Sequence, residues 1–216
     1  MGNSTNARRI FIARHGETVF NAVAKMQGQK AVHTPLTRLG FRQADAMGAA
    51  LARHIGPDTR VILCASTAGR ALQTLAIVVE HIGADWHMTH ADGRLHEIDV
   101  GDWSDRHYAD VIAESGPIVD LESRLFSVRP PNGEYYEDVA ARLSSWIADY
   151  ADEPSDLVVL MHGMSARVLR GLLLGLPVDT KFGAPIAHSI AQGSMVMIQD
   201  GIETMIIDGD GAEERA

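Results

Sequence analysis

The sequence predicts a single α/β domain, residues 1–216, in which helices cover both faces of a mainly parallel central sheet. Its 216 residues suit one moderately large domain, and the 46% of hydrophobic residues can supply a sizeable core. Short apolar runs alternate with longer segments whose apolar residues recur at helical spacing. No internal repeat or low-complexity linker divides the chain, and we expect only the ends, residues 1–7 and 209–216, to be flexible.

Buried strands are predicted where apolar residues follow one another between turn-forming residues. In chain order these segments are 9–13, 61–64, a shorter one at 86–89, and 157–161. Two or three further strands, at the edge of the sheet, are expected near Ile186, at 195–198 and at 205–207.

Helices are predicted where apolar residues recur three and four positions apart. They are expected at 38–55, 68–82, 136–150 and 164–174. Thr37 and Thr67 are the predicted N-caps of the first two helices, and Gly56 and Gly83 follow their ends. The segment between residues 94 and 133, rich in Gly, Pro and charge, is expected to form loops and short helices.

Composition limits the partners of the chain. The formal net charge is −9, without a long run of one sign, so nucleic acid is not an expected partner. No apolar stretch is long enough to span a bilayer, and the polar segment Met1 to Arg9 lacks the apolar run of a signal peptide. The single cysteine, Cys64, excludes an intrachain disulfide framework and indicates a reducing compartment. We therefore expect a cytoplasmic protein without a membrane partner.

Residues suited to phosphate follow three of the predicted strands. Arg14 to Thr18 come after the first strand, Ser66 to Arg70 after the second, and His162-Gly163 after the strand at 157–161. The carboxyl ends of parallel strands meet at one edge of a sheet, where ligands bind. Arginine forks and helix N-termini both favour an anion. The sequence thus predicts a basic pocket in an acidic protein, suited to a small phosphorylated molecule.

The segment Arg14-His15-Gly16-Glu17-Thr18 resembles the signature of the histidine phosphatase superfamily, also called the phosphoglycerate mutase-like superfamily. Further blocks resemble this family in the same order over nearly the whole chain. They are Pro35-Leu36-Thr37 with Gly40 and Gln43-Ala44, Arg70-Ala71-Leu72-Gln73-Thr74, Leu95-His96-Glu97-Ile98 with Gly101 and Trp103, Pro131-Asn132-Gly133-Glu134, and His162-Gly163. The ordered series is much more specific than the first segment alone.

The resemblance implies a phosphoglycerate mutase-like fold and a phosphohistidine mechanism that needs no metal or other cofactor. His15 would attack phosphorus, and Glu97 would protonate the leaving oxygen and then activate water. The residues implied to neutralise the phosphoryl oxygens are Arg14, Arg70 and His162. The further substrate-binding residues are Asn21, Thr18 and Gly163.

Several positions depart from the family pattern. Ser104-Asp105 follows Trp103 where many phosphatase members have Glu-Gly, and His96 replaces an arginine common before the acid. His33 stands roughly where an aspartate precedes Pro35, and Tyr135 stands where serine is frequent. None belongs to the phosphate-binding set, so the departures leave the leaving group, and hence the substrate, open.

Phosphoglycerate-type mutase activity is the nearest alternative. Mutase members carry a longer basic block after the acid, which residues 99–116 lack, so hydrolysis is favoured. A non-catalytic binding module would be expected to have lost a site residue, whereas the set is complete. The sequence leaves the oligomeric state open, a homo-oligomer included.

Two other catalytic classes are less consistent with the sequence. Cys64 and Arg70 have the spacing found in cysteine-dependent phosphatases, but Cys64 ends an apolar run and is expected to be a core residue. His87 and His90 lie near other possible metal ligands, but their spacing matches no standard zinc motif.

Overall fold

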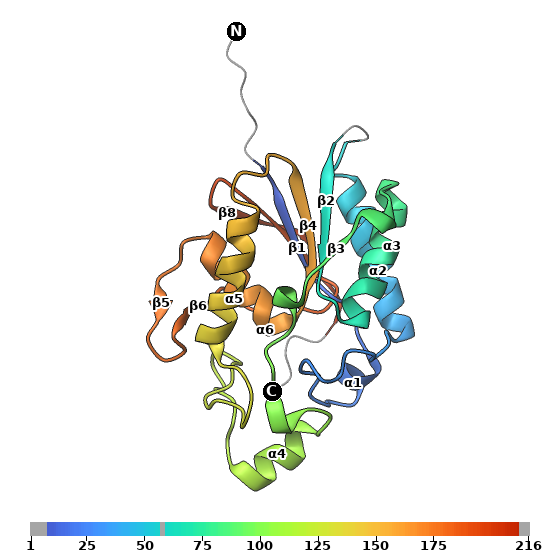
Figure 1. The fold of residues 1–216 in the computed structure, drawn as a ribbon. Coiled ribbons are helices and arrows are strands. Elements are labelled where there is room, and N and C mark those ends of the chain that lie inside the picture. The colour runs from blue at the N-terminus through green and yellow to red at the C-terminus, as the bar shows by residue number, and fades with distance from the viewer. Residues whose placement is uncertain (1–7, 57–58, 212–216) are drawn as a thin grey trace.

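The computed structural model describes residues 8–56 and 59–211. It shows three layers, a central sheet with helices on both faces, as the sequence predicts (Figure 1). Within the expected flexible ends, residues 1–7 and 212–216 lie outside the described residues. Gly209 to Gly211 are described and lie against Gln43 and Gln192.

The central sheet has six strands in the order β3-β2-β4-β1-β7-β8. Their bounds are Ile10–Arg14 (β1), Val61–Ala65 (β2), His90–Ala91 (β3), Asp156–Met161 (β4), Met195–Gln199 (β7) and Ile202–Ile207 (β8). The pairs β1–β4, β2–β4 and β2–β3 are parallel, whereas β1–β7 and β7–β8 are antiparallel. Strands β1 and β4 are buried along their whole length, which explains their unbroken apolar sequence.

The helices are α1 (Val19–Ala22), α2 (Arg38–Ala52), α3 (Gly69–Ile82), α4 (Tyr108–Ser115), α5 (Tyr136–Asp149) and α6 (Gly163–Leu173). Three short 3-10 turns, η1 (Trp86–Met88), η2 (Gly93–Leu95) and η3 (Gly101–Trp103), lie in the connections. Each of these helices is too short or too polar to cross a lipid bilayer.

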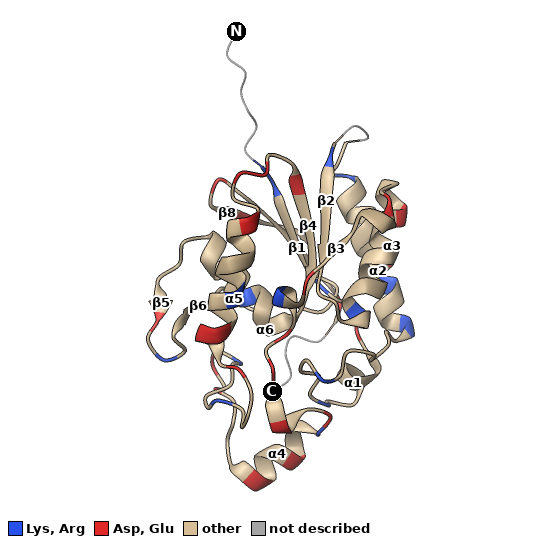
Figure 2. Ribbon diagram, in the orientation of Figure 1, with Lys and Arg blue, Asp and Glu red and all other residues tan. Residues whose placement is uncertain are grey.

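Two apolar clusters hold the layers together. Phe11 and Ala13 point into the cluster under α2 and α3, whereas Ile10 and Ile12 point into the larger cluster under α5 and α6. This alternation follows from the two-residue period of a strand. Lys and Arg are scattered over many elements, and α4 carries several acidic residues (Figure 2).

Local expectations were partly wrong. The segment at 86–89 is mainly the turn η1, because the Asp85 side chain accepts a hydrogen bond from His87 N at 2.9 Å, and strand pairing begins only at His90. Residues Ala184–Pro185 (β6) pair with Val178–Asp179 (β5) outside the central sheet, so no strand of that sheet forms near Ile186. Strand β7 lies inside the sheet, and only β8 forms its edge there.

The two predicted N-caps had opposite outcomes. Thr37 is confirmed, since its side chain accepts from Gly40 N at 3.1 Å. Thr67 is not a cap, because α3 begins after Ala68 and the Thr67 hydroxyl bonds to His96 instead. The N-cap residue is Ala68, whose own backbone nitrogen donates to the hydroxyl of Ser66 at 3.2 Å.

Candidate active site

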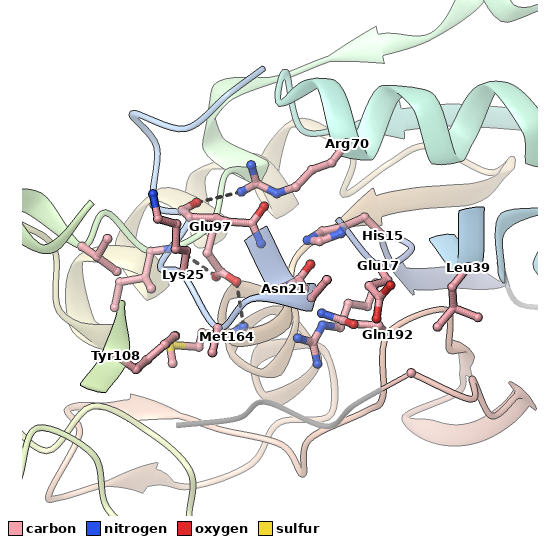
Figure 3. Close-up of a pocket in the computed structure, with 18 of the residues that line it drawn as sticks. His15, Glu17, Asn21, Lys25, Leu39, Arg70, Glu97, Tyr108, Met164 and Gln192 are labelled. Atoms are coloured by element: carbon pink, nitrogen blue, oxygen red, sulfur yellow. Dashed lines mark hydrogen bonds between the residues drawn. The ribbon is translucent and has the colours of Figure 1, made fainter. Parts of the chain in front are cut away.

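The parallel strands bring three distant segments to one end of the sheet. Arg14 pairs in register with Met161, and Ala65 pairs with Leu160. The residues that follow these strand ends are therefore neighbours. They face a cavity of about 390 Å³, whose lining includes Arg14, His15, Asn21, Arg70 and Glu97 (Figure 3).

The loop after β1 is held tightly against the start of α2. A Cβ atom on Gly16 would lie 2.4 Å from the Gly40 carbonyl oxygen, and one on Gly40 would lie 2.1 Å from the Glu17 carbonyl oxygen. The backbones thus approach as closely as only glycine permits. Thr37 N also donates to Glu17 O at 2.9 Å, which fixes the backbone that presents His15.

His15 is presented in one tautomer. Its Nδ1 lies 2.7 Å from the carbonyl oxygen of Gly16, which can only accept, so Nδ1 carries the proton and Nε2 keeps its lone pair. Burial lowers the pKa of His15 well below its usual value, and the positive charges of Arg70 and Arg14 lower it further. The imidazole is therefore neutral near pH 7, the form that a nucleophile needs.

Two buried guanidinium groups face this imidazole. Arg14 donates from Nη1 to Ile190 O at 3.0 Å, while its buried Nε has no hydrogen-bond partner in the described chain. Arg70 donates to the carbonyl oxygens of Ala31 and Gln27, both at 3.0 Å. Burial lowers the pKa of Arg70 to about 10, so it remains a cation at neutral pH. Carbonyl groups orient these cations without neutralising them, which suits an anion.

His162 has the opposite tautomer. Its Nδ1 accepts from Arg70 Nε at 3.2 Å, so its Nε2 donates to the hydroxyl of Ser66 at 2.8 Å. Burial, followed by the charge of Arg70, lowers the pKa of His162 well below its usual value. The ring centroids of His15 and His162 are 5.2 Å apart, but His162 is fully buried and does not itself line the cavity.

Glu97 caps the N-terminus of α6 from the side of the cavity. Its Oε1 accepts from Ser165 N at 2.9 Å and Ile98 N at 3.0 Å, and its Oε2 accepts from Met164 N at 3.2 Å. Glu97 thus lies at the cavity wall with an oxygen available to a ligand (Figure 3).

The remaining predicted substrate-binding residues differ in position. Asn21 lines the cavity, and its Oδ1 accepts from Thr18 N at 3.0 Å. Thr18 is fully buried, and its hydroxyl caps α1 by accepting a hydrogen bond from Asn21 N at 3.1 Å. Gly163, the first residue of α6, is buried as well, and neither it nor Thr18 lines the cavity. Direct contact of either residue with a substrate stays a prediction.

Other residues support the site through contacts that sequence reasoning missed. Thr74 and Gln43 accept from the backbone nitrogens of Gly16 and Glu17, at 3.1 and 2.7 Å. Glu134 accepts two hydrogen bonds from Arg142, whose guanidinium also donates to Glu97 O at 3.2 Å. Gln43, Thr74 and Glu134 stand in the family-like blocks, but sequence alone does not show which backbone atoms they hold.

The rival sites are not formed. Cys64 is buried in the core, and burial raises the pKa of its thiol to about 11, so it is not a thiolate near pH 7. His87 and His90 are exposed. Within residues 8–56 and 59–211, no group of three His, Cys, Asp or Glu side chains is arranged to hold a metal ion.

Residues 10–201 match the family model described as histidine phosphatase superfamily (branch 1), so the chain belongs to this superfamily. It is 34% identical over 172 residues to a probable phosphoglycerate mutase GpmB of Enterobacter sp., an alignment that covers 78% of this chain and 76% of the relative. It is also 34% identical over 183 residues to the glucosyl-3-phosphoglycerate phosphatase of Mycobacterium tuberculosis, covering 80% and 78%.

Solved structures agree with this membership. A mycobacterial glucosyl-3-phosphoglycerate phosphatase in complex with VO3 has a TM-score of 0.75 and 28% identity, covering 95% of this chain and 100% of that one. The chain is accordingly an enzyme of the histidine phosphatase type that acts on a phosphorylated metabolite. Both hydrolysis and the phosphoglycerate-type mutase reaction are represented in the names of its relatives.

Proposed function

We propose that the chain hydrolyses a small phosphomonoester through a phosphohistidine at His15, without a metal ion or organic cofactor. One observation supports this proposal more strongly than any other. The hydrogen bond to Gly16 leaves Nε2 of a neutral imidazole unprotonated beside two buried arginines whose partners are carbonyl groups and His162. This is the pairing of nucleophile and anion site that phosphoryl transfer requires.

In the first step, His15 Nε2 attacks phosphorus and the bond from phosphorus to the leaving oxygen breaks. Arg14 and Arg70 balance the negative charge of the phosphoryl oxygens. Protonated Glu97 gives its proton to the leaving oxygen, so that an alcohol departs. In the second step, water attacks the phosphohistidine, Glu97 takes the proton from that water, and inorganic phosphate leaves.

His162 takes part after a rearrangement. When a phosphate dianion binds, the imidazole takes up a proton from solvent at Nδ1, which then donates to a phosphoryl oxygen. Arg70 Nε, released from His162, then turns to the same ligand. Asn21 offers its amide Nδ2 to the substrate. We assign Thr18 to orienting Asn21, and Gly163 to starting α6, rather than to contacting the substrate.

The similarity to the GpmB relative supports phosphoglycerate mutase activity as the second candidate. Both reactions share phosphorylation of His15, and they differ in whether water or a second alcohol accepts the group. The single thiol of the chain supports a cytoplasmic location for either activity.

The proposal is tested with para-nitrophenyl phosphate in the presence of a strong chelator. Wild-type protein should release phosphate, and rapid quenching in base should trap a phosphoprotein that is stable in alkali and lost in acid, as expected of phosphohistidine. His15→Ala should abolish both, whereas Cys64→Ala should retain them. Activity that chelation destroys and added metal restores would contradict the proposal. Transfer from one phosphoglycerate to another without release of phosphate would favour the mutase.

A further inference from the structure

Six residues form the part of the cavity next to Glu97, which we call the leaving-group lobe. They are Lys25, Ile98, Val100, Tyr108, Phe126 and Met164. Figure 3 shows Lys25, Tyr108 and Met164 on the same side of the view as Glu97, whereas Leu39 lies on the opposite side, beyond His15, and Glu17 and Gln192 lie below His15.

The position of the proposed acid decides which part of the cavity receives the leaving group. Glu97 must reach the oxygen that departs, so the group attached to that oxygen lies next to Glu97. Met164 N donates to Glu97 Oε2 at 3.2 Å, which places the Met164 residue directly at this carboxylate. The leaving group therefore enters the lobe that Met164 helps to form.

The lobe is mainly apolar. Ile98, Val100, Phe126 and Met164 are all less than 5% exposed, yet each lines the cavity. The rings of Tyr108 and Phe126 stack with their centroids 6.4 Å apart, and the Tyr136 hydroxyl contacts Met164 Sδ at 3.6 Å. A ligand that covers this rigid surface gains binding energy in proportion to its own apolar area.

The lobe offers little to a negative leaving group. Among the described residues that line the cavity, Lys25 is the only cation besides Arg14 and Arg70. Its Nζ donates to a carboxylate oxygen of Asp105 at 3.0 Å, so its charge is already paired. Glu17, Glu97 and Asp210 add carboxylates to the same cavity.

Asp105 also has an unusual backbone conformation. Its φ is +66°, a conformation that favours glycine and that Asp and Asn tolerate better than most residues. A glycine at this position would leave Lys25 without its partner. The aspartate therefore keeps the lobe close to electrically neutral.

We propose that the leaving group of the natural substrate is uncharged and mainly apolar, and that Asp105 excludes anionic leaving groups by pairing with Lys25. This inference rests on the proposed phosphatase function. The inferred substrate differs from the phosphoglycerates that the names of two relatives specify, because a glycerate leaving group carries a carboxylate.

The first experiment compares methyl, ethyl, propyl and butyl phosphate with 3-phosphoglycerate, and uses para-nitrophenyl phosphate as a general reporter. The alkyl leaving groups have similar intrinsic reactivity, so differences report binding in the lobe. We expect kcat/KM to rise roughly two- to fourfold with each added methylene, since each buries about one methylene of apolar surface. 3-Phosphoglycerate should fall at least about tenfold below butyl phosphate.

The second experiment releases Lys25. Asp105→Asn suits the positive φ and removes the charge, so the ratio of kcat/KM for 3-phosphoglycerate to that for butyl phosphate should rise about two- to fivefold, as expected of an exposed ion pair. Asp110→Asn is the matched control, because it removes the same charge. Asp110 is exposed on α4 and does not line the cavity. It should leave the ratio unchanged.

The outcomes separate the two proposals. If para-nitrophenyl phosphate phosphorylates His15 but 3-phosphoglycerate is preferred to butyl phosphate, the inference about the lobe is overturned and the phosphatase function stands. An equal rise of the ratio in Asp105→Asn and Asp110→Asn would overturn the role of Asp105. If no ester phosphorylates His15, the proposed function and the inference fail together.

Discussion

At the scale of single residues, the site depends on which nitrogen of each histidine carries a proton. Gly16 O requires Nδ1–H on His15, whereas Arg70 Nε requires an unprotonated Nδ1 on His162. The two imidazoles are thus chemically different although their centroids are only 5.2 Å apart. His15 is in the form that the proposed nucleophile needs, whereas His162 accepts a hydrogen bond from Arg70.

Replacing the arginines tests the planar fork rather than the charge. Arg70→Lys keeps a cation but cannot donate at once to Ala31 O, Gln27 O and His162. We expect a loss in kcat on the order of 10²-fold for Arg70→Lys, and a similar loss for Arg14→Lys. Arg38→Lys, at an exposed position on α2, is the control and should retain full turnover. Wild-type rates in both cavity variants would place the phosphate site elsewhere.

At the scale of elements, the strand ends and helix starts position the chemistry. Strand β1 presents Arg14 and His15, the first turn of α3 presents Arg70, and the start of α6 holds Glu97. The close approach of Gly16 and Gly40 joins the first of these segments to α2. The elements thus act through a few backbone contacts as much as through side chains.

The role of Glu97 is tested by changing the leaving group. Glu97→Gln can still accept hydrogen bonds from the start of α6, but it has no carboxylic proton to give. Phosphorylation of His15 by an alkyl phosphate should slow by roughly 10²–10⁴-fold, while that by para-nitrophenyl phosphate should change little, because its leaving group is stable as an anion. Single-turnover kinetics measure this step alone. Glu80→Gln, on the exposed part of α3, is the control. Equal slowing of both esters would show that Glu97 is not the acid.

The backbone contact between the first loop and α2 makes a separate prediction. In Gly40→Ala, the new methyl group would lie 2.1 Å from Glu17 O, so one backbone must move. We expect the free energy of unfolding in urea to fall by about 1–3 kcal/mol, and kcat to fall with it because the loop carries His15. Gly93→Ala is the matched control, since no atom lies within 4 Å of the Cβ atom that it adds. An equally stable Gly40→Ala protein would contradict the proposed constraint.

At the scale of the whole molecule, the fold buries the polar groups of the site. It keeps the two histidines neutral and gives the two arginines neutral hydrogen-bond partners. His15, His162, Arg14 and Arg70 are each no more than 5% exposed. Burying such groups costs stability that the two apolar clusters on either face of the sheet must supply. The site therefore couples the stability of the protein to pH.

The two buried histidines set the direction of that coupling. Folding lowers the pKa of His15 and of His162, mainly through burial, so between the folded values and about 6.5 the unfolded chain binds more protons. Their contribution is complete above pH 6.5 and is lost as the pH falls below it. We expect the free energy of unfolding to drop between pH 7 and pH 5. The His15→Gln, His162→Gln double variant should lose less over the same interval, and an identical loss would contradict this assignment.

The α/β class, the main strands and the family could be predicted from the sequence, because these depend on local periodicity and on an ordered series of short segments. The grouping of Arg14, His15 and Arg70 could be predicted in the same way, since strand ends in a parallel sheet must converge, whereas Glu97 was predicted only from the resemblance of its segment to the family. The sequence did not reveal the contacts that individual side chains make. It could not show that Thr67 bonds to His96 rather than capping α3, nor that Thr18 is buried as the cap of α1.

The folded chain was needed to see the tautomers, the cap that Glu97 places on α6, and the pairing of Lys25 with Asp105. Each depends on contacts between side chains and backbone atoms from segments that are distant in the chain. Lys25 and Asp105, for example, are 80 positions apart. Local pattern carries no information about which of several nearby partners such a group will meet, because packing of the complete fold makes that choice.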